Sequence, residues 1–176
     1  MAFSFSRADI PELVIVTPQV YKDDRGCFFE VYKQSEFKAN GIEEDFCQDN
    51  HSISKKNVLR GMHYQTGPNA QGKLVTVVRG EILDVAVDMR KESPTYLKWI
   101  SVVLSADNKK LFYIPAGFAH GFLSLTDDTD VVYKCTREYD KSVEGGIRFD
   151  DPTLAIDWGI KDPILSEKDA ALPCVI

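Results

Sequence analysis

Short stretches rich in β-branched and aromatic residues recur along the chain, each followed by turn-forming residues. This spacing limits the fold most, because short strands separated by turns build sandwiches and barrels rather than alternating strand–helix units. The runs predicted as strands are Cys27–Tyr32, Leu74–Val78, Ile82–Val87, Trp99–Leu104, Phe112–Ile114, Phe122–Leu125 and Val131–Cys135. A length of 176 residues suits one domain. We therefore expect a mostly β chain that folds as one sandwich or barrel domain over residues 1–176.

Polarity alternates with a period of two in the predicted strand over 82–87, as expected for side chains on opposite faces of a strand. One face carries Leu83, Val85 and Val87, and the other carries Asp84, Ala86 and Asp88. Gly80 lies between two such runs and is predicted to form a tight hairpin. A short helix is predicted near Ser35–Asn40, with Gly41 placed to end it. The last 25 residues are expected to form loops and short helical turns.

Composition limits which partners the protein is expected to bind and in which compartment it is expected to occur. There are 21 lysines and arginines against 27 aspartates and glutamates, so the net charge is −6, which argues against nucleic-acid binding. No run approaches the roughly 20 apolar residues of a membrane span, and the first residues do not resemble a signal peptide. The four cysteines form no close pairs, as is usual for free thiols in a reducing cytosol. We expect a cytoplasmic protein that binds neither nucleic acid nor a membrane.

The chain contains three histidines, His51, His63 and His120. His120 ends a Pro-x-Gly-x-x-His pattern that begins at Pro115. Proline and glycine shape a turn, and the histidine then points inward from the next strand. This pattern resembles the second motif of the cupin superfamily, whose fold is a small antiparallel jelly-roll barrel.

The first cupin motif usually provides His-x-His and a later glutamate as metal ligands. The matching stretch here reads His63-Tyr64-Gln65, and Lys73 follows instead of a carboxylate. An ammonium group has no lone pair for a metal and repels a cation. We therefore expect no resident metal or other cofactor, with His63 and His120 forming at most a weak metal site.

Several further motifs occur in a fixed order and cover nearly the whole chain. They are Arg25–Glu30, Gln48–Ser52, Leu59–Gln65, Gly72–Val75, Asp84–Arg90, Pro115–Phe122, Tyr133–Thr136, Tyr139 and Leu165–Asp169. Together they resemble the dTDP-4-dehydrorhamnose 3,5-epimerase family, also called dTDP-4-dehydro-6-deoxy-D-glucose 3,5-epimerase. The resemblance implies a cofactor-independent isomerase that converts dTDP-4-dehydro-6-deoxy-D-glucose to dTDP-4-dehydro-L-rhamnose in dTDP-L-rhamnose biosynthesis.

Four parts of the sequence depart from the family pattern: two single residues and two short stretches. Cys27 replaces an aromatic residue and Leu97 replaces a common glycine. Phe149–Pro152 and Trp158–Gly159 also differ from the usual sequences. None of these changes removes a residue that the chemistry needs, so they affect only the expected loop shapes.

The implied reaction removes a proton beside a ketone and returns one to the opposite face. It needs a base, an acid on the other side and a donor at the ketone oxygen. A free imidazole has a pKa of about 6.5, so His63 suits the base, and Tyr133 is protonated at neutral pH and suits the acid. Lys73 is the candidate that stabilises the enolate oxygen. The resemblance assigns Asp169 as the carboxylate that orients His63, by the logic of the serine-protease triad.

The resemblance also implies a set of residues that bind the substrate. Arginine suits a diphosphate because its planar fork forms paired charge-assisted bonds, and an aromatic ring suits stacking on the thymine or the sugar. The set is Arg25, Phe28, Glu30, Gln48, Asp49, Asn50, Arg60, His120, Tyr139, Glu144 and Lys168.

Arg60 and His63 have opposite parity on a regular strand. Both can reach one pocket only if the strand is distorted, and Gly61 is where a bulge is easiest.

Three alternatives remain open at this point: a mono-epimerase of the same family, a metal-dependent cupin enzyme and a non-catalytic sugar-binding module. The resemblance further suggests a homodimer, with strands or an N-terminal segment that reach across to the partner.

Overall fold

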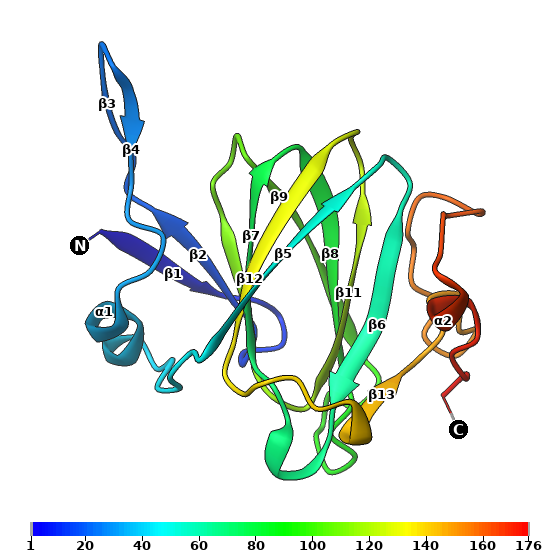
Figure 1. The fold of residues 1–176 in the computed structure, drawn as a ribbon. Coiled ribbons are helices and arrows are strands. Elements are labelled where there is room, and N and C mark those ends of the chain that lie inside the picture. Colours follow the sequence, from blue (N-terminus) through cyan, green and yellow to red (C-terminus); the bar gives the residue numbers. More distant parts are fainter. Residues whose placement is uncertain (1, 176) are drawn as a thin grey trace.

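The computed structural model describes residues 2–175, which form two large antiparallel sheets and a small hairpin (Figure 1). The six-stranded sheet runs β1 (Phe3–Arg7), β2 (Val14–Pro18), β10 (Leu111–Ile114), β7 (Lys73–Arg79), β12 (Thr129–Cys135) and β5 (Gln48–Ser54). The five-stranded sheet runs β13 (Glu144–Gly146), β6 (Leu59–Gln65), β11 (Phe118–Ser124), β8 (Glu81–Asp88) and β9 (Trp99–Ser105). The hairpin consists of β3 (Tyr21–Asp23) and β4 (Gly26–Phe28).

Helices are few and short. They are α1 (Gln34–Ala39), α2 (Glu167–Ala170) and the 3-10 turns Gly67–Asn69 and Lys141–Val143. The prediction of a mostly β antiparallel fold with a few short helices is therefore confirmed. No helix among residues 2–175 is both long enough and apolar enough to span a bilayer.

The two large sheets enclose an apolar core. Val75 and Val77 of β7 and Val131 of β12 face Ala86 of β8 and Phe122 of β11 across this interior. All five are nearly or fully buried. Burial of an aliphatic or aromatic side chain of this size contributes roughly 1.5–3 kcal/mol, so this cluster holds the sheets together.

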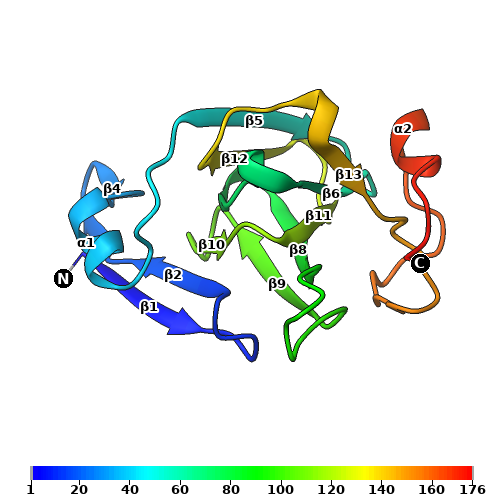
Figure 2. The same cartoon turned by 90° about the horizontal axis from the view of Figure 1, so that it is seen from below.

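The alternation predicted in β8 is present, but both faces are covered. Val85 and Val87 point outward and pack against Leu154 and Trp158 of the C-terminal segment. The opposite face, which carries Asp84, points into the barrel. Seen from below in Figure 2, α1 and the N-terminal strands lie on one side of the barrel and α2 lies on the other.

The prediction of a hairpin at Gly80 is wrong. β7 and β8 lie in different sheets, so Gly80 is a corner between sheets and not a hairpin. Its φ is +80°, and a Cβ there would lie 2.4 Å from Thr126 Oγ1 and 2.7 Å from Thr129 Oγ1.

The strand predicted over Cys27–Tyr32 is also wrong in its extent, because only Cys27 and Phe28 belong to a strand. The short helix is confirmed over Gln34–Ala39.

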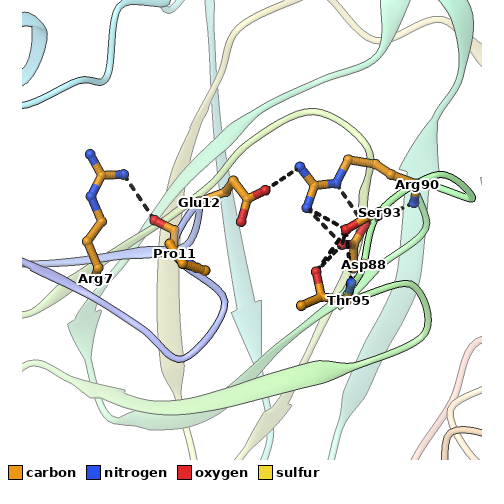
Figure 3. A network of polar contacts seen from close by, with 7 residues as sticks. All are labelled: Arg7, Pro11, Glu12, Asp88, Arg90, Ser93 and Thr95. Atoms are coloured by element: carbon orange, nitrogen blue, oxygen red, sulfur yellow. Dashed lines mark hydrogen bonds and ion pairs between the residues drawn. The ribbon is translucent and has the colours of Figure 1, made fainter.

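A polar network ties the N-terminal strands to the barrel (Figure 3). Arg90 forms an ion pair with Glu12, 2.7 Å away in the loop before β2, and another with Asp88 at the end of β8. Ser93 and Thr95 also donate to Asp88, which is fully buried. Burial alone would raise the pKa of Asp88, but these donors outweigh burial and hold the pKa well below its usual value.

Candidate active site

A polar cavity opens between the two large sheets, in two adjoining halves of about 250 and 240 Å³. Both halves are lined by His63, Lys73 and Tyr133. His63 comes from β6 of the five-stranded sheet, whereas Lys73 and Tyr133 come from β7 and β12 of the other sheet. The imidazole therefore faces the phenol and the ammonium from the opposite wall.

His63 is paired with a carboxylate from the C-terminal segment. Its Nε2 lies 2.7 Å from Oδ1 of Asp169, a residue that is 5% exposed. The backbone N–H of Asp169 donates to Ser166 Oγ at the start of α2, and this cap fixes the place of the acid. Burial alone would raise the pKa of Asp169, but the bond to His63 lowers it below its usual value. An ionised carboxylate accepts a hydrogen bond, so it holds the proton of neutral His63 on Nε2 and leaves the Nδ1 lone pair free.

The expected distortion of β6 is confirmed. His63 pairs with His120 of β11, and Arg60 pairs with Phe122, so three steps on β6 match two on β11. One extra residue in β6 puts Arg60 and His63 on the same face, and both line the cavity. Arg60 is further held by its Nε, which donates to Ser54 Oγ at 3.1 Å.

Lys73 and Tyr133 are half-buried in the opposite wall. Burial lowers the pKa of Lys73, while Cys135 and Asp84 oppose that effect. Burial raises the pKa of Tyr133, so the phenol keeps its proton at neutral pH. Val131 and Cys135, which share a strand face with Tyr133, are buried, so this face of β12 points inward.

His120 lies deeper, next to β8. It is 6% exposed and its Nε2 lies 2.9 Å from Oδ1 of Asp84. His120 lines the same half of the cavity as Arg60 and Lys168.

The mouth of the cavity is formed by a chain of polar contacts. Glu144 accepts from Tyr139 Oη at 2.9 Å and also forms an ion pair with Lys168. Gln48 Nε2 donates to Asn50 Oδ1 at 3.0 Å, and Gln48 Oε1 accepts from the backbone N–H of Tyr139 at 2.8 Å. The structure thus brings these five predicted binding residues together.

Asp49 does not join them. Alternation along β5 turns it to the outer face, where it forms an ion pair with Lys134 at 2.9 Å. Asp49 therefore lies outside the cavity as this chain forms it, and its role in substrate binding stays a prediction.

Arg25, Phe28 and Glu30 also lie away from the cavity within one chain. Arg25 and Phe28 belong to the β3–β4 hairpin, which pairs only with itself and projects from the barrel (Figure 1). Arg25 bonds to Asp23 at the same tip, and Phe28 is 67% exposed. A hairpin that extends outward cannot deliver these side chains to His63 of its own chain.

The sequence reasoning missed several lining residues. Ser52 faces the cavity with Gln48 and Asn50, and the period of two along β5 could have found it. Gln71, Tyr64, Phe122 and Ser166 also line the cavity. Phe122 could also have been found, because it lies two residues after the inward-pointing His120 on one strand.

Gln65, which replaces a histidine of the cupin motif, forms hydrogen bonds to the backbone of neighbouring loops. Its Nε2 donates to the carbonyl of Asn69 at 2.8 Å, and its Oε1 accepts from the backbone N–H of Asp140 at 2.7 Å. Among residues 2–175, no group of three or more His, Cys, Asp or Glu side chains is placed to hold a metal ion.

Comparison with known proteins decides the family. A family model described as dTDP-4-dehydrorhamnose 3,5-epimerase matches residues 7–175. The chain belongs to this family. The dTDP-4-dehydrorhamnose 3,5-epimerase of Salmonella typhimurium is 52% identical over 166 residues, which cover 93% of this chain and 91% of that protein.

Solved structures of the family agree with the fold. The dTDP-6-deoxy-D-glucose-3,5-epimerase of Legionella pneumophila, in complex with dTDP-4-keto-L-rhamnose, has a TM-score of 0.94 and 46% identity, covering 98% of this chain and 92% of that one. The dTDP-4-dehydrorhamnose 3,5-epimerase of Bacillus anthracis, with TDP and PPi bound, has a TM-score of 0.97 and 40% identity, covering 99% and 100%. The cupin-type jelly roll and the 3,5-epimerase resemblance are thereby confirmed.

Proposed function

We propose that this chain is an isomerase that epimerises dTDP-4-dehydro-6-deoxy-D-glucose at C3 and C5 to give dTDP-4-dehydro-L-rhamnose, a step of dTDP-L-rhamnose biosynthesis. The observation that carries this proposal is the placement of His63 and Tyr133 on opposite walls of one cavity with Lys73 beside them. Two-sided proton transfer at a carbon next to a ketone needs this arrangement, because the proton leaves one face and returns to the other.

The first step is removal of an α-proton by His63. The electron pair of the C–H bond forms the enolate, whose negative oxygen receives a hydrogen bond from the Lys73 ammonium. Asp169 stabilises the imidazolium that forms, as in other carboxylate–histidine pairs.

Tyr133 then gives its proton to the same carbon from the opposite face. The imidazolium of His63 returns its proton to solvent and the phenolate regains one, so the enzyme ends as it began. The same cycle at the second α-carbon completes the double inversion without a redox change or a co-reactant.

The rest of the cavity fits a nucleotide diphosphate sugar. Arg60 is the arginine that the cavity offers to a diphosphate, and Lys168 adds a second cation. Tyr139 is 52% exposed at the mouth, where its ring can stack on a thymine. Gln48 and Asn50 supply amide donors and acceptors beside it.

Incubation with dTDP-4-dehydro-6-deoxy-D-glucose in deuterated water tests the reaction. We expect solvent deuterium at two carbons of each product molecule, detected by mass spectrometry and NMR, and we expect activity to survive exhaustive chelation. Deuterium at one carbon would identify a mono-epimerase. Binding without exchange would identify a sugar-binding module, and loss of activity with the metal would identify a metal-dependent cupin enzyme.

The hairpin supports a homodimer. Phe28 is largely exposed, and an apolar groove beside the hairpin is lined by Cys27, Phe29, Val78 and Val132. Exposed apolar groups of this kind mark interaction sites. We therefore place Arg25, Phe28 and Glu30 in the substrate site of a second copy of the chain. Free cysteines at positions 27, 47, 135 and 174 fit a cytoplasmic location for this dimer.

A further inference from the structure

Gln65 is a buried amide that the proton transfers above do not use. It ends β6 two residues after His63 and is 5% exposed. Both ends of its amide are bonded to backbone groups of loops: Nε2 donates to the carbonyl of Asn69 at 2.8 Å, and Oε1 accepts from the N–H of Asp140 at 2.7 Å. A buried amide that is bonded at both ends holds together the segments that it joins.

One of these loops carries Tyr139, and both peptide groups next to this residue are held. In the peptide group before it, the carbonyl of Glu138 lies 3.5 Å from Gln65 Nε2, and the N–H of Tyr139 donates to Gln48 Oε1 at 2.8 Å. In the peptide group after it, the N–H of Asp140 donates to Gln65 Oε1. Because each peptide group is planar, these bonds fix the direction in which the Tyr139 side chain leaves the backbone.

The far end of the Tyr139 side chain is held by the neighbouring strand. Glu144 of β13 lies directly opposite Gln65 of β6 in the sheet register, and it accepts from Tyr139 Oη at 2.9 Å. Tyr139 is nevertheless 52% exposed, so much of its surface stays open to a ligand. A ring that is fixed before binding loses less conformational freedom when a base stacks on it.

We propose that Gln65 is a positioning residue for nucleotide recognition: it fixes the loop that carries Tyr139, and so sets the place of the aromatic ring relative to His63. The inference rests on the proposed function, from which it takes the stacking of thymine on Tyr139. Gln65 and His63 lie two positions apart on β6 and line the same half of the cavity, so one strand carries both the base and the support of this loop. Gln65 acts through Tyr139.

A double-mutant cycle on the affinity for dTDP, measured by calorimetry, tests this role. Gln65→Met keeps an unbranched side chain of similar length but removes the amide, and Tyr139→Ala removes the ring. We expect dTDP to bind about three- to tenfold more weakly to Gln65→Met and about 10- to 100-fold more weakly to Tyr139→Ala. The double variant is expected to bind dTDP within about twofold of Tyr139→Ala, because no ring is left to position. Additive losses, or unchanged affinity in either single variant, would overturn the proposal.

Two comparisons separate positioning from a general loss of structure. In Gln65→Met we expect KM to rise while kcat stays within about threefold, because the groups that transfer protons are unchanged. Gln34→Met makes the same substitution at a glutamine whose Nε2 donates to Asp45 Oδ1 at 2.6 Å, outside the cavity. We expect this control to bind dTDP within about twofold of the wild type. An equal loss of affinity in both variants, or a fall in kcat without a rise in KM, would contradict the role of Gln65.

Two further measurements distinguish the possible failures. Wild-type enzyme that binds dTDP but does not turn over the ketosugar contradicts the proposed function rather than the role of Gln65. If Gln65→Met does not fold, amide hydrogen exchange of the wild type replaces it. We expect the N–H groups of Tyr139 and Asp140 to exchange at least about tenfold more slowly than unbonded loop amides, and rapid exchange of both would overturn the proposal.

Discussion

The pairing of His63 with Asp169 joins two residues that are 106 positions apart in the sequence. An imidazole is a weak base for a C–H bond, so its contribution depends on how it is held and on how well the enolate is stabilised. Asp169 fixes which nitrogen of the imidazole carries the proton, and Lys73 lines the opposite wall of the same cavity, where the proposed reaction forms negative charge. In the proposed reaction, the base and the group that stabilises the enolate therefore act from opposite walls of the cavity.

Replacement of His63 by asparagine tests the base. We expect kcat to fall about 10²- to 10⁴-fold, the usual range for loss of a general base, with little change in nucleotide-sugar affinity measured by calorimetry. His51→Asn is the control, because His51 is exposed on the outer face of β5 and pairs with Asp130. Normal turnover by the His63 variant would contradict the assignment of His63 as the base.

Which residues line the cavity was predictable where the alternation along a strand or the family resemblance applied. Gln48 and Asn50 share a strand face, and the same alternation places Asp49 on the other side, a consequence that the motif alone concealed. The alternation also predicted that Asp84 lies on the polar face of its strand. Its burial was not predictable, because that depends on the second sheet covering it.

At the scale of elements, local chemistry predicted the bulge but not the corner. The opposite parity of Arg60 and His63 required a distortion near Gly61, and the register of β6 has it. Gly80 carries the same turn signal as a hairpin glycine. Whether the two flanking strands pair or separate into two sheets is decided by contacts far away in the sequence, which no local pattern encodes.

Gly61→Ala tests the bulge. Gly61 has a φ of +131°, and a Cβ there would lie 2.5 Å from Gly121 Cα and 2.9 Å from the His120 carbonyl oxygen. We expect the backbone of β6 or β11 to shift, with a loss of roughly 2–4 kcal/mol in the free energy of unfolding and a lower kcat. Urea denaturation and steady-state kinetics measure the two effects.

Gly26→Ala controls for the backbone angle alone. Gly26 has the same φ of +131°, but nothing lies within 4 Å of its Cβ position. We expect this variant to lose less stability than Gly61→Ala. Equal losses would show that close packing against β11 plays no part.

At the scale of the whole molecule, the cavity lies between the two large sheets, and the β3–β4 hairpin projects away from the barrel (Figure 1). Both sheets and the C-terminal helix contribute to the cavity. The mostly β class was predictable from the spacing of strands and turns. The pairing order was not, because neighbours such as β2 and β10 are almost a hundred residues apart.

Mixing two inactive variants tests the homodimer. Arg25→Ala removes the proposed contribution to the partner, and His63→Asn removes the base of its own cavity. A mixed dimer contains one intact site, so equal mixing restores about a quarter of the wild-type sites. No recovery after verified subunit exchange, or full activity of Arg25→Ala alone, would contradict the arrangement.

The extra residue in β6 also bears on how this sequence can diverge. A substitution between Leu59 and Gln65 changes one side chain and leaves the pairing register of the strand in place. A single-codon insertion or deletion between Arg60 and His63 would instead turn every later side chain of the strand to the other face and separate Arg60 from His63. Evolution of this segment can therefore change its residues far more easily than its number of residues.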